Sequence, residues 1–259
     1  MKALLMVSFG TSYPETRRKT LDLIQAEMTE AFPERTVFRA WTSRMIIRKV
    51  RERDGIQIDT VEEALQRMAL AGADDVLIQS THVIPGYEYE KMLQDVRKAE
   101  DSFRRISIGR PLLDTAEDMD AVVKVMAEAV PAEGDDVVIC MGHGTAHEAN
   151  DIYAEMQKAF RRAGHDAYYV ATVEGSPVLS DVLGALEGRK AGMVHLVPLM
   201  VVSGDHVLND MAGGEPHSWK RQCQEAGYEV ICHLEGLGER QAIRDLLLQH
   251  AIAACNRSR

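Results

Sequence analysis

The sequence predicts an α/β protein of two similar doubly wound lobes, each with a parallel sheet flanked by helices, and an active-site cleft between the lobes. Three observations lead to this prediction. The chain contains an internal repeat, its strand-like runs are apolar without polar alternation, and amphipathic helical segments separate these runs.

The internal repeat consists of two matched pairs of segments. The stretch ALLMVSFGT at 3–11 matches VVICMGHGT at 137–145, and VLIQSTHVIPGYE at 76–88 matches VHLVPLMVVSGDH at 194–206. The first copy is longer by about 16 residues, and TSRMIIRKVRERDG at 42–55 is the candidate insertion. A polar break, PAEGDD at 131–136, separates the copies. We therefore expect an N-terminal lobe over residues 1–130 and a C-terminal lobe over residues 131–259.

The individual elements follow from hydrophobic patterns. Strands are predicted where short apolar runs occur, at 4–7, 36–41, 76–79, 137–141 and 194–202. Helices are predicted where apolar residues recur every three or four positions, around 21–28, 61–68, 119–130 and 243–252. Two of these helices have capping boxes at their starts, formed by Thr60 with Glu63 and by Thr115 with Asp118.

Composition excludes several classes of function. The chain has 259 residues, 46% of them hydrophobic, and a net charge of −10, which disfavours nucleic acid and anionic membranes as partners. The four cysteines are widely spaced without a C-x-x-C motif, so no zinc knuckle or disulfide framework is indicated. The apolar run at 3–7 is too short for a signal peptide, and no run is long enough to span a membrane. We expect a cytoplasmic protein.

Candidate functional residues follow the predicted strands, where open parallel sheets bind their ligands. Those of the first copy are Ser8, Phe9, Gly10, Thr11, His82 and Glu88, and those of the second are His143, Gly144, Glu174 and His206. In the repeat, Phe9 is aligned with His143 and Glu88 with His206. These exchanges indicate one asymmetric site rather than two equivalent ones.

Two histidines with a carboxylate suit a borderline divalent metal ion bound with open coordination positions, and histidine can also act as a base near neutral pH. Each residue also has an ordinary structural interpretation, since a histidine after a strand is most often a hydrogen-bonded loop residue. The sequence has no G-x-G-x-x-G after its first strand and no G-K-[ST], so we expect no nucleotide.

Five segments resemble the anaerobic-type sirohydrochlorin cobaltochelatases, and the likeness covers nearly the whole chain. They are VSFGTS at 7–12, FRAWTSRMIIRKVRERDGIQIDT at 38–60, GYEYEK at 86–91, MGHGTAH at 141–147 and PLMVVSGDHVLNDMAG at 198–213. MGHG and the SGDH-x-x-ND block are the specific parts. The resemblance implies a ferrochelatase-like fold and a lyase that inserts Co²⁺ into the tetrapyrrole sirohydrochlorin for cobalamin or sirohaem biosynthesis. Fe²⁺ and Ni²⁺ suit the same ligands, and a homo-oligomer is compatible with the sequence.

The resemblance also implies roles for individual residues. His143 would be the base and a metal ligand, and His206 would be a second ligand. Both Glu174 and Glu88 fit the third position; we favour Glu174, because it shares a copy with both histidines, and Glu88 would then accept a proton. Either carboxylate could instead stabilise a helix start. Phe9 would contact the macrocycle, with the metal on the His143 side.

The substrate is a polycarboxylate, whereas the protein is acidic, so attraction must be local. The inserted segment carries a basic cluster of Arg44, Arg48, Lys49, Arg51 and Arg53. We predict that Arg48 binds substrate carboxylates. The alternative is a solvated face paired with Glu52 and Asp54.

Two other functions fit the architecture. One is a two-lobed small-molecule binding protein, which would not need paired histidines at strand ends. The other is a zinc-dependent hydrolase, against which the wide ligand spacing and the lack of H-E-x-x-H argue.

Overall fold

The computed structural model describes residues 1–188 and 192–257, and the chain forms two compact units. Unit 1 comprises Met1–Asp114 and Gly238–Arg259, and unit 2 comprises Thr115–Leu237. None of the helices in the described residues is long and apolar enough to cross a membrane.

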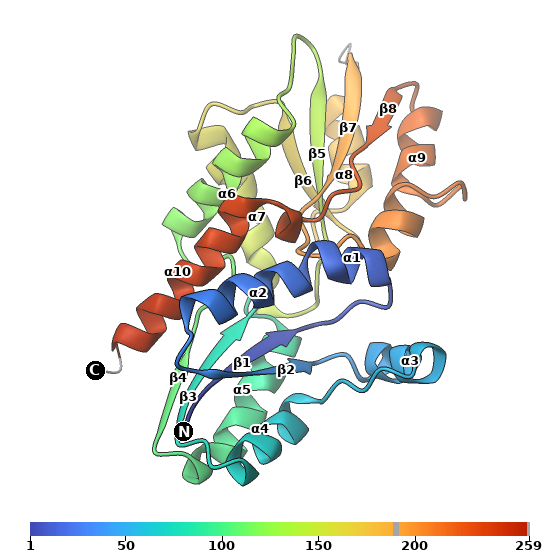
Figure 1. Ribbon diagram of the computed structural model, residues 1–259. Helices are drawn as coiled ribbons and strands as arrows, with labels where there is room; N and C mark the ends of the chain where they lie inside the picture. The colour runs from blue at the N-terminus through green and yellow to red at the C-terminus, as the bar shows by residue number, and fades with distance from the viewer. Residues whose placement is uncertain (189–191, 258–259) are drawn as a thin grey trace. The chain divides into compact units, whose positions relative to one another are not determined.

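Unit 1 is built on a four-stranded parallel sheet in the order β2-β1-β3-β4 (Figure 1). Its strands are β1 (Lys2–Ser8), β2 (Thr36–Trp41), β3 (Asp75–Ser80) and β4 (Arg105–Ile108). The central strands β1 and β3 are almost entirely buried, which explains their unbroken apolar sequence. Because all four strands are parallel, their carboxyl ends lie at one edge of the sheet.

Helices cover both faces of this sheet. The helices of unit 1 are α1 (Pro14–Lys19), α2 (Leu21–Ala31), α3 (Arg44–Asp54), α4 (Val61–Leu70), α5 (Tyr87–Ala99), the short 3-10 helix η1 (Glu100–Ser102) and α10 (Gln241–Arg257). The helices α4 and α5 bury one face, while α2 and α10 lie on the other (Figure 1). The capping box predicted at Thr60 and Glu63 is present at the start of α4.

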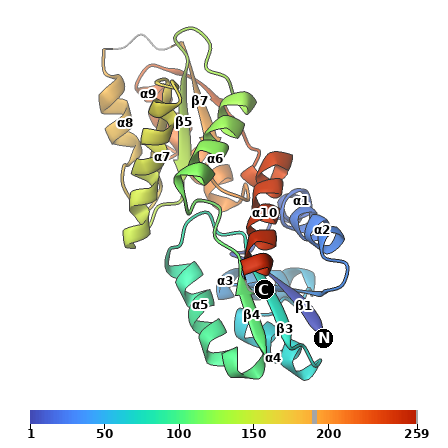
Figure 2. The ribbon, with the colours of Figure 1, turned by 90° about the vertical axis from the view of Figure 1, so that its left-hand side faces the viewer.

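Unit 2 repeats this arrangement with a parallel sheet in the order β6-β5-β7-β8. Its strands are β5 (Val137–Gly142), β6 (Tyr168–Thr172), β7 (Met193–Pro198) and β8 (Glu229–Cys232). Its helices are α6 (Ala116–Ala129), the 3-10 helix η2 (Glu148–Asn150), α7 (Asp151–Arg162), α8 (Leu179–Leu186), the π-helix η3 (His206–Met211) and α9 (Trp219–Glu225); the 3-10 helix η4 (Leu237–Glu239) leads out of the unit. Helices α8, α9 and η3 share a core with one face of the sheet, and α7 packs on β6 beside α6 (Figure 2).

The two sheets confirm the predicted parallel architecture and the match between the copies. The strands β1 and β5 occupy the same place in the strand order, as do β3 and β7. Helix α3 is the extra element of the first copy and falls in the predicted insertion at 42–55. The strand predicted over 194–202 is shorter in the structure, because β7 ends at Pro198 and a loop follows.

The compact units differ from the expected division of the chain at residue 131. Helix α6 belongs to unit 2, where it packs against α7. Helix α10 belongs to unit 1, where it contacts β3, β4 and α2. The buried Arg244 of α10 donates to Glu27 of α2 at 2.8 Å. The return of the last helix to the first unit is a tertiary contact that hydrophobic periodicity does not reveal.

Candidate metal site

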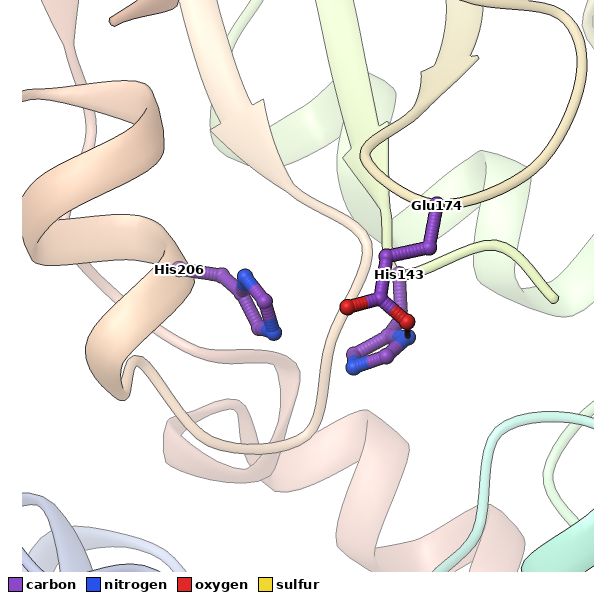
Figure 3. Close-up of side chains that lie close together, drawn as sticks. All are labelled: His143, Glu174 and His206. Carbon is purple, nitrogen blue, oxygen red and sulfur yellow. Dashed lines mark ion pairs between the residues drawn. The ribbon is translucent and has the colours of Figure 1, made fainter.

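Three side chains of unit 2 come together just beyond the carboxyl ends of its strands. His143 follows β5, Glu174 lies in the loop after β6, and His206 is the first residue of η3, after β7 (Figure 3). One potential ligand atom from each residue lies within 4.8 Å of the other two. The described residues contain no other such group of histidine, cysteine or acidic side chains.

The geometry of this cluster leaves it accessible. His143 Nδ1 lies 3.7 Å from Glu174 Oε2, and the two imidazole rings are nearly perpendicular, with centroids 4.6 Å apart. The side chains of His143 and Glu174 are 42% and 59% exposed, and that of His206 is 30% exposed. Partly exposed nitrogen and oxygen donors can take up a divalent ion and also release it.

Hydrogen bonds indicate which imidazole nitrogen each histidine presents. His143 Nδ1 lies 3.0 Å from the carbonyl oxygen of Gly144, and His206 Nδ1 lies 2.6 Å from Asp210 Oδ2. A carbonyl and a carboxylate can only accept, so the neutral form of each ring that makes these hydrogen bonds carries its proton on Nδ1. The remaining nitrogen, Nε2, is therefore the atom that each histidine can offer to a metal.

Backbone hydrogen bonds join the two chain segments that carry His143 and Glu174. The N–H of Glu174 donates to the carbonyl of His143 at 2.8 Å, and the N–H of Val173 donates to that of Gly142 at 3.1 Å. Gly144 allows this close approach, because it has a φ of +79° and a Cβ there would lie 2.3 Å from the nitrogen of Gly175. The glycine after His143 is thus required by the neighbouring loop.

The sequence did not predict a role for Asn150, which joins the loop after β5 to the loop after β6. Asn150 Oδ1 accepts a hydrogen bond from the backbone N–H of Thr145 at 3.1 Å, and its Nδ2 donates to the carbonyl of Ser176 at 2.7 Å. Asn150 lies five residues beyond Thr145 and 26 before Ser176. No motif marks a contact of this kind, so the sequence contains no signal for it.

The predicted site residues of the first copy lie at the matching edge of the sheet in unit 1. Ser8 ends β1 and is buried, as is Thr11, whereas Phe9 is 38% exposed. Gly10 has a φ of +100°, and a Cβ there would lie 2.7 Å from the indole of Trp41. Gly10 is therefore explained by local packing, and substrate contacts by these four residues stay predictions.

His82 makes hydrogen bonds within unit 1 through both of its ring nitrogens. Nδ1 lies 2.6 Å from Ser80 Oγ, and Nε2 lies 3.3 Å from Thr42 Oγ1. Desolvation lowers the pKa of His82 to about 4, so the ring is neutral at pH 7. Ser80 Oγ also accepts a hydrogen bond from the backbone N–H of His82 at 3.0 Å, and a substrate contact by His82 stays a prediction.

Glu88 and Arg48 lie on two helices, α5 and α3, that follow strands of unit 1. Glu88 is in the first turn of α5, and its Oε2 is buried without a hydrogen-bond partner in the part of the chain that the structure describes. Arg48 is exposed on α3 and lines a hollow of about 440 Å³ with Met45, Lys49, Glu52 and Arg53. Arg53 is held by Asp54 and by the carbonyl of Ser12.

Comparison with known proteins gives concordant matches over nearly the full chain. The family model of the cobalt chelatase CbiK matches residues 2–256. A sirohydrochlorin cobaltochelatase of Salmonella typhimurium is 41% identical over 256 residues, which cover 98% of this chain and 97% of that protein. A sirohydrochlorin cobaltochelatase of Nitratidesulfovibrio vulgaris, CbiKC, is 34% identical, covering 98% of this chain and 90% of that protein.

Solved structures support the fold. SirB from Bacillus subtilis with Fe³⁺ superimposes with a TM-score of 0.67 at 15% identity, covering 99% of this chain and 97% of that one. CbiX, described as the terminal enzyme of sirohaem biosynthesis in denitrifying bacteria, superimposes with a TM-score of 0.61 at 16% identity, covering 98% and 99% of the two chains. Together with the sequence matches, these findings show that the chain belongs to the cobalt chelatase (CbiK) family.

Proposed function

We propose that this protein inserts Co²⁺ into sirohydrochlorin, and that His143, Glu174 and His206 hold the metal before its transfer. The observation that carries the proposal is the convergence of these three side chains, with ligand atoms within 4.8 Å of one another, in a chain of the cobalt chelatase family. The proposed substrate is that of the relatives from Salmonella typhimurium and Nitratidesulfovibrio vulgaris.

These three ligands suit a metal ion that must be transferred from the protein to the tetrapyrrole. Two neutral imidazoles and one carboxylate bind Co²⁺ without the strong hold of a closed thiolate site, and they leave positions for incoming ring nitrogens. In this proposal Glu174, rather than Glu88, is the third ligand, because Glu174 brings a carboxylate oxygen within 4.8 Å of a ring nitrogen of each histidine. Fe²⁺ and Ni²⁺ fit the same donors.

Metal insertion releases two pyrrole protons, which need acceptors close to the macrocycle. His143 can accept one of them only on Nε2, since Nδ1 carries a proton that it donates to the Gly144 carbonyl. The same nitrogen cannot bind Co²⁺ and a proton at once. We therefore place proton transfer to His143 after the metal has left Nε2 for the two unprotonated ring nitrogens and before the two N–H nitrogens bind it.

Glu88 is the proposed second proton acceptor. Its buried Oε2 has no hydrogen-bond partner among the described residues, so a donor from the substrate would satisfy it. Arg48 is proposed to bind peripheral carboxylates, and Ser8, Phe9, Gly10, Thr11, His82 and Gly144 are proposed to contact the substrate. The reaction as written uses no nucleotide. A cytoplasmic location stays a prediction.

The test is a Co²⁺ insertion assay in which the absorption of sirohydrochlorin is followed with wild-type protein, with His143→Ala and with buffer alone. We expect acceleration by the wild type and a loss of at least about 100-fold with His143→Ala, because both a ligand and a base are removed. His217→Ala, a change at an exposed histidine, is the matched control. No acceleration by the wild type would refute the function, and full activity of His143→Ala would refute the mechanism.

A further inference from the structure

We propose that Asp210 is a positioning residue that fixes the ring orientation and the tautomer of His206, and thereby strengthens Co²⁺ binding. This inference rests on the proposed function and concerns the same site. It assigns a role to the last residue of the SGDH-x-x-ND block, of which only His206 has so far been given one.

The contact between the two side chains is short and directional. Asp210 Oδ2 lies 2.6 Å from His206 Nδ1, and each side chain is 30% exposed. Since a carboxylate accepts, the Nδ1 proton is held there and Nε2 keeps its lone pair. A carboxylate on the far nitrogen also makes an imidazole a stronger donor to a metal.

The backbone of η3 places the pair on the accessible side of a fixed element. Val207 and Met211 are fully buried in the core of unit 2, so the helix cannot rotate without exposing them. The N–H of Ala212 donates to the carbonyl of Val207, the five-residue spacing of a π-helix. Because the backbone is held in this way, only the His206 side chain can still rotate. Its hydrogen bond to Asp210 restricts this rotation.

The alternative is an ordinary helix-surface pair. Such pairs contribute a few tenths of a kcal/mol to stability and have no connection with ligand binding. The same helix offers a pair of this kind for comparison, because Asn209 Nδ2 donates to Asp205 Oδ1 at 3.0 Å, also four residues apart. Asn209→Ala therefore removes a matched contact from η3 without touching His206.

The experiment is a Co²⁺ titration of the protein without tetrapyrrole, followed by the visible absorption of bound Co²⁺, for Asp210→Ala, Asp210→Asn and Asn209→Ala. We expect the Kd for Co²⁺ to rise about 10- to 100-fold in Asp210→Ala, the range typical for loss of such a partner. Asp210→Asn should lie between this variant and the wild type, because an amide oxygen still accepts from Nδ1. Asn209→Ala should stay within about twofold of wild type, since it leaves the His206 contact intact.

Steady-state kinetics give a second readout that a structural role would not move. The KM for Co²⁺ should rise in Asp210→Ala, while the KM for sirohydrochlorin stays unchanged. If Asp210→Ala fails to fold, Asp210→Asn decides the question by the same two measurements.

The outcomes separate this inference from the function on which it rests. If His206→Ala loses Co²⁺ binding but the folded Asp210 variants bind as tightly as wild type, the positioning role is refuted and the proposed site stands. If His206→Ala itself binds Co²⁺ like wild type, the proposed metal site is refuted as well. An equal loss in Asn209→Ala would show that the stability of η3, rather than the His206 contact, controls binding, and would also overturn the proposal.

Discussion

At the residue scale, His143 depends on the glycines on each side of it. A Cβ on Gly142 would lie 2.2 Å from the ring of Tyr153, and one on Gly144 would lie 2.3 Å from the backbone nitrogen of Gly175. A side chain at position 142 would require the ring of Tyr153 to move, and one at position 144 would require the backbone of the loop that carries Glu174 to move. The positions of the proposed metal ligands therefore depend on backbone packing as well as on their own contacts.

Gly144→Ala should consequently affect both stability and metal binding. Its φ of +79° is unfavourable for alanine, and the added methyl meets backbone atoms that cannot move independently. We expect a loss of about 1–3 kcal/mol in the free energy of unfolding and weaker Co²⁺ binding. Urea denaturation and a Co²⁺ titration measure the two effects. Gly184→Ala, at a helical glycine with open space around it, is the control and should show neither loss.

Glu174 and Glu88 should give different kinetic effects when each is changed to glutamine. Loss of the Glu174 carboxylate removes a proposed metal ligand, so Glu174→Gln should raise the KM for Co²⁺ by about 10-fold or more. Loss of the Glu88 carboxylate removes the proposed second proton acceptor, so Glu88→Gln should mainly lower kcat. Steady-state kinetics with both substrates varied distinguish the two cases. The reverse pattern would exchange the roles of these residues.

At the scale of single elements, α3 is the main difference between the two copies. It begins with a Ser43 cap directly after β2 and buries Ile47 and Val50, so its basic residues lie on the outer side. Arg53 is engaged by Asp54, whereas no hydrogen bond or ion pair is found for Arg48 or Lys49 among the described residues. Exposed cations without an acidic partner in the described part of the chain, such as Arg48 and Lys49, contribute little to stability and are available to bind a polycarboxylate ligand.

Arg48→Ala should therefore raise the KM for sirohydrochlorin by about three- to tenfold and leave the KM for Co²⁺ unchanged, because one charged hydrogen bond to a carboxylate is lost. The effect should shrink at high ionic strength, since the attraction is electrostatic. Arg51→Ala removes an exposed arginine of α3 that does not line the hollow, and it should have no such effect. Equal KM values for wild type and Arg48→Ala would remove Arg48 from the substrate site.

At the scale of the whole molecule, the repeat in the sequence was sufficient to predict the two parallel sheets and the residues beyond their strands. The alignment of Phe9 with His143 and of Glu88 with His206 predicts that the two histidines belong to one site, and the structure brings His143, His206 and Glu174 together. The carboxyl ends of parallel strands lie at one edge of the sheet whatever the conformation of the loops. The position of His143, Glu174 and His206 at this edge could therefore be predicted.

Other features depend on contacts between distant segments and could not be predicted. The return of α10 to unit 1 rests on contacts such as Arg244 with Glu27, which lie 217 positions apart. The π-helix that carries His206 has no simple sequence pattern, and the amide of Asn150 joins two loops that no periodicity connects. Asp210 was visible in the ND part of the motif, but only the structure shows its contact with His206.

The stability of the molecule should fall in mild acid because of His82. Its pKa of about 4 in the folded protein lies below the ordinary value near 6.5, so the unfolded chain binds more protons between these values. The stabilisation is complete above pH about 6.5 and is lost progressively as the pH falls towards 4, by up to about 3 kcal/mol. Urea denaturation at a series of pH values measures this slope. His82→Gln should flatten it, whereas His217→Gln, at an exposed histidine, should not.

The central claim is that Co²⁺ is held by His143, Glu174 and His206 in unit 2. The most direct measurement is anomalous diffraction at the cobalt edge from crystals of the protein soaked in Co²⁺. We predict one strong peak within bonding distance of Nε2 of both histidines and of a carboxylate oxygen of Glu174, and no such peak in crystals of His143→Ala. A strong cobalt peak that none of these three side chains contacts would contradict the account.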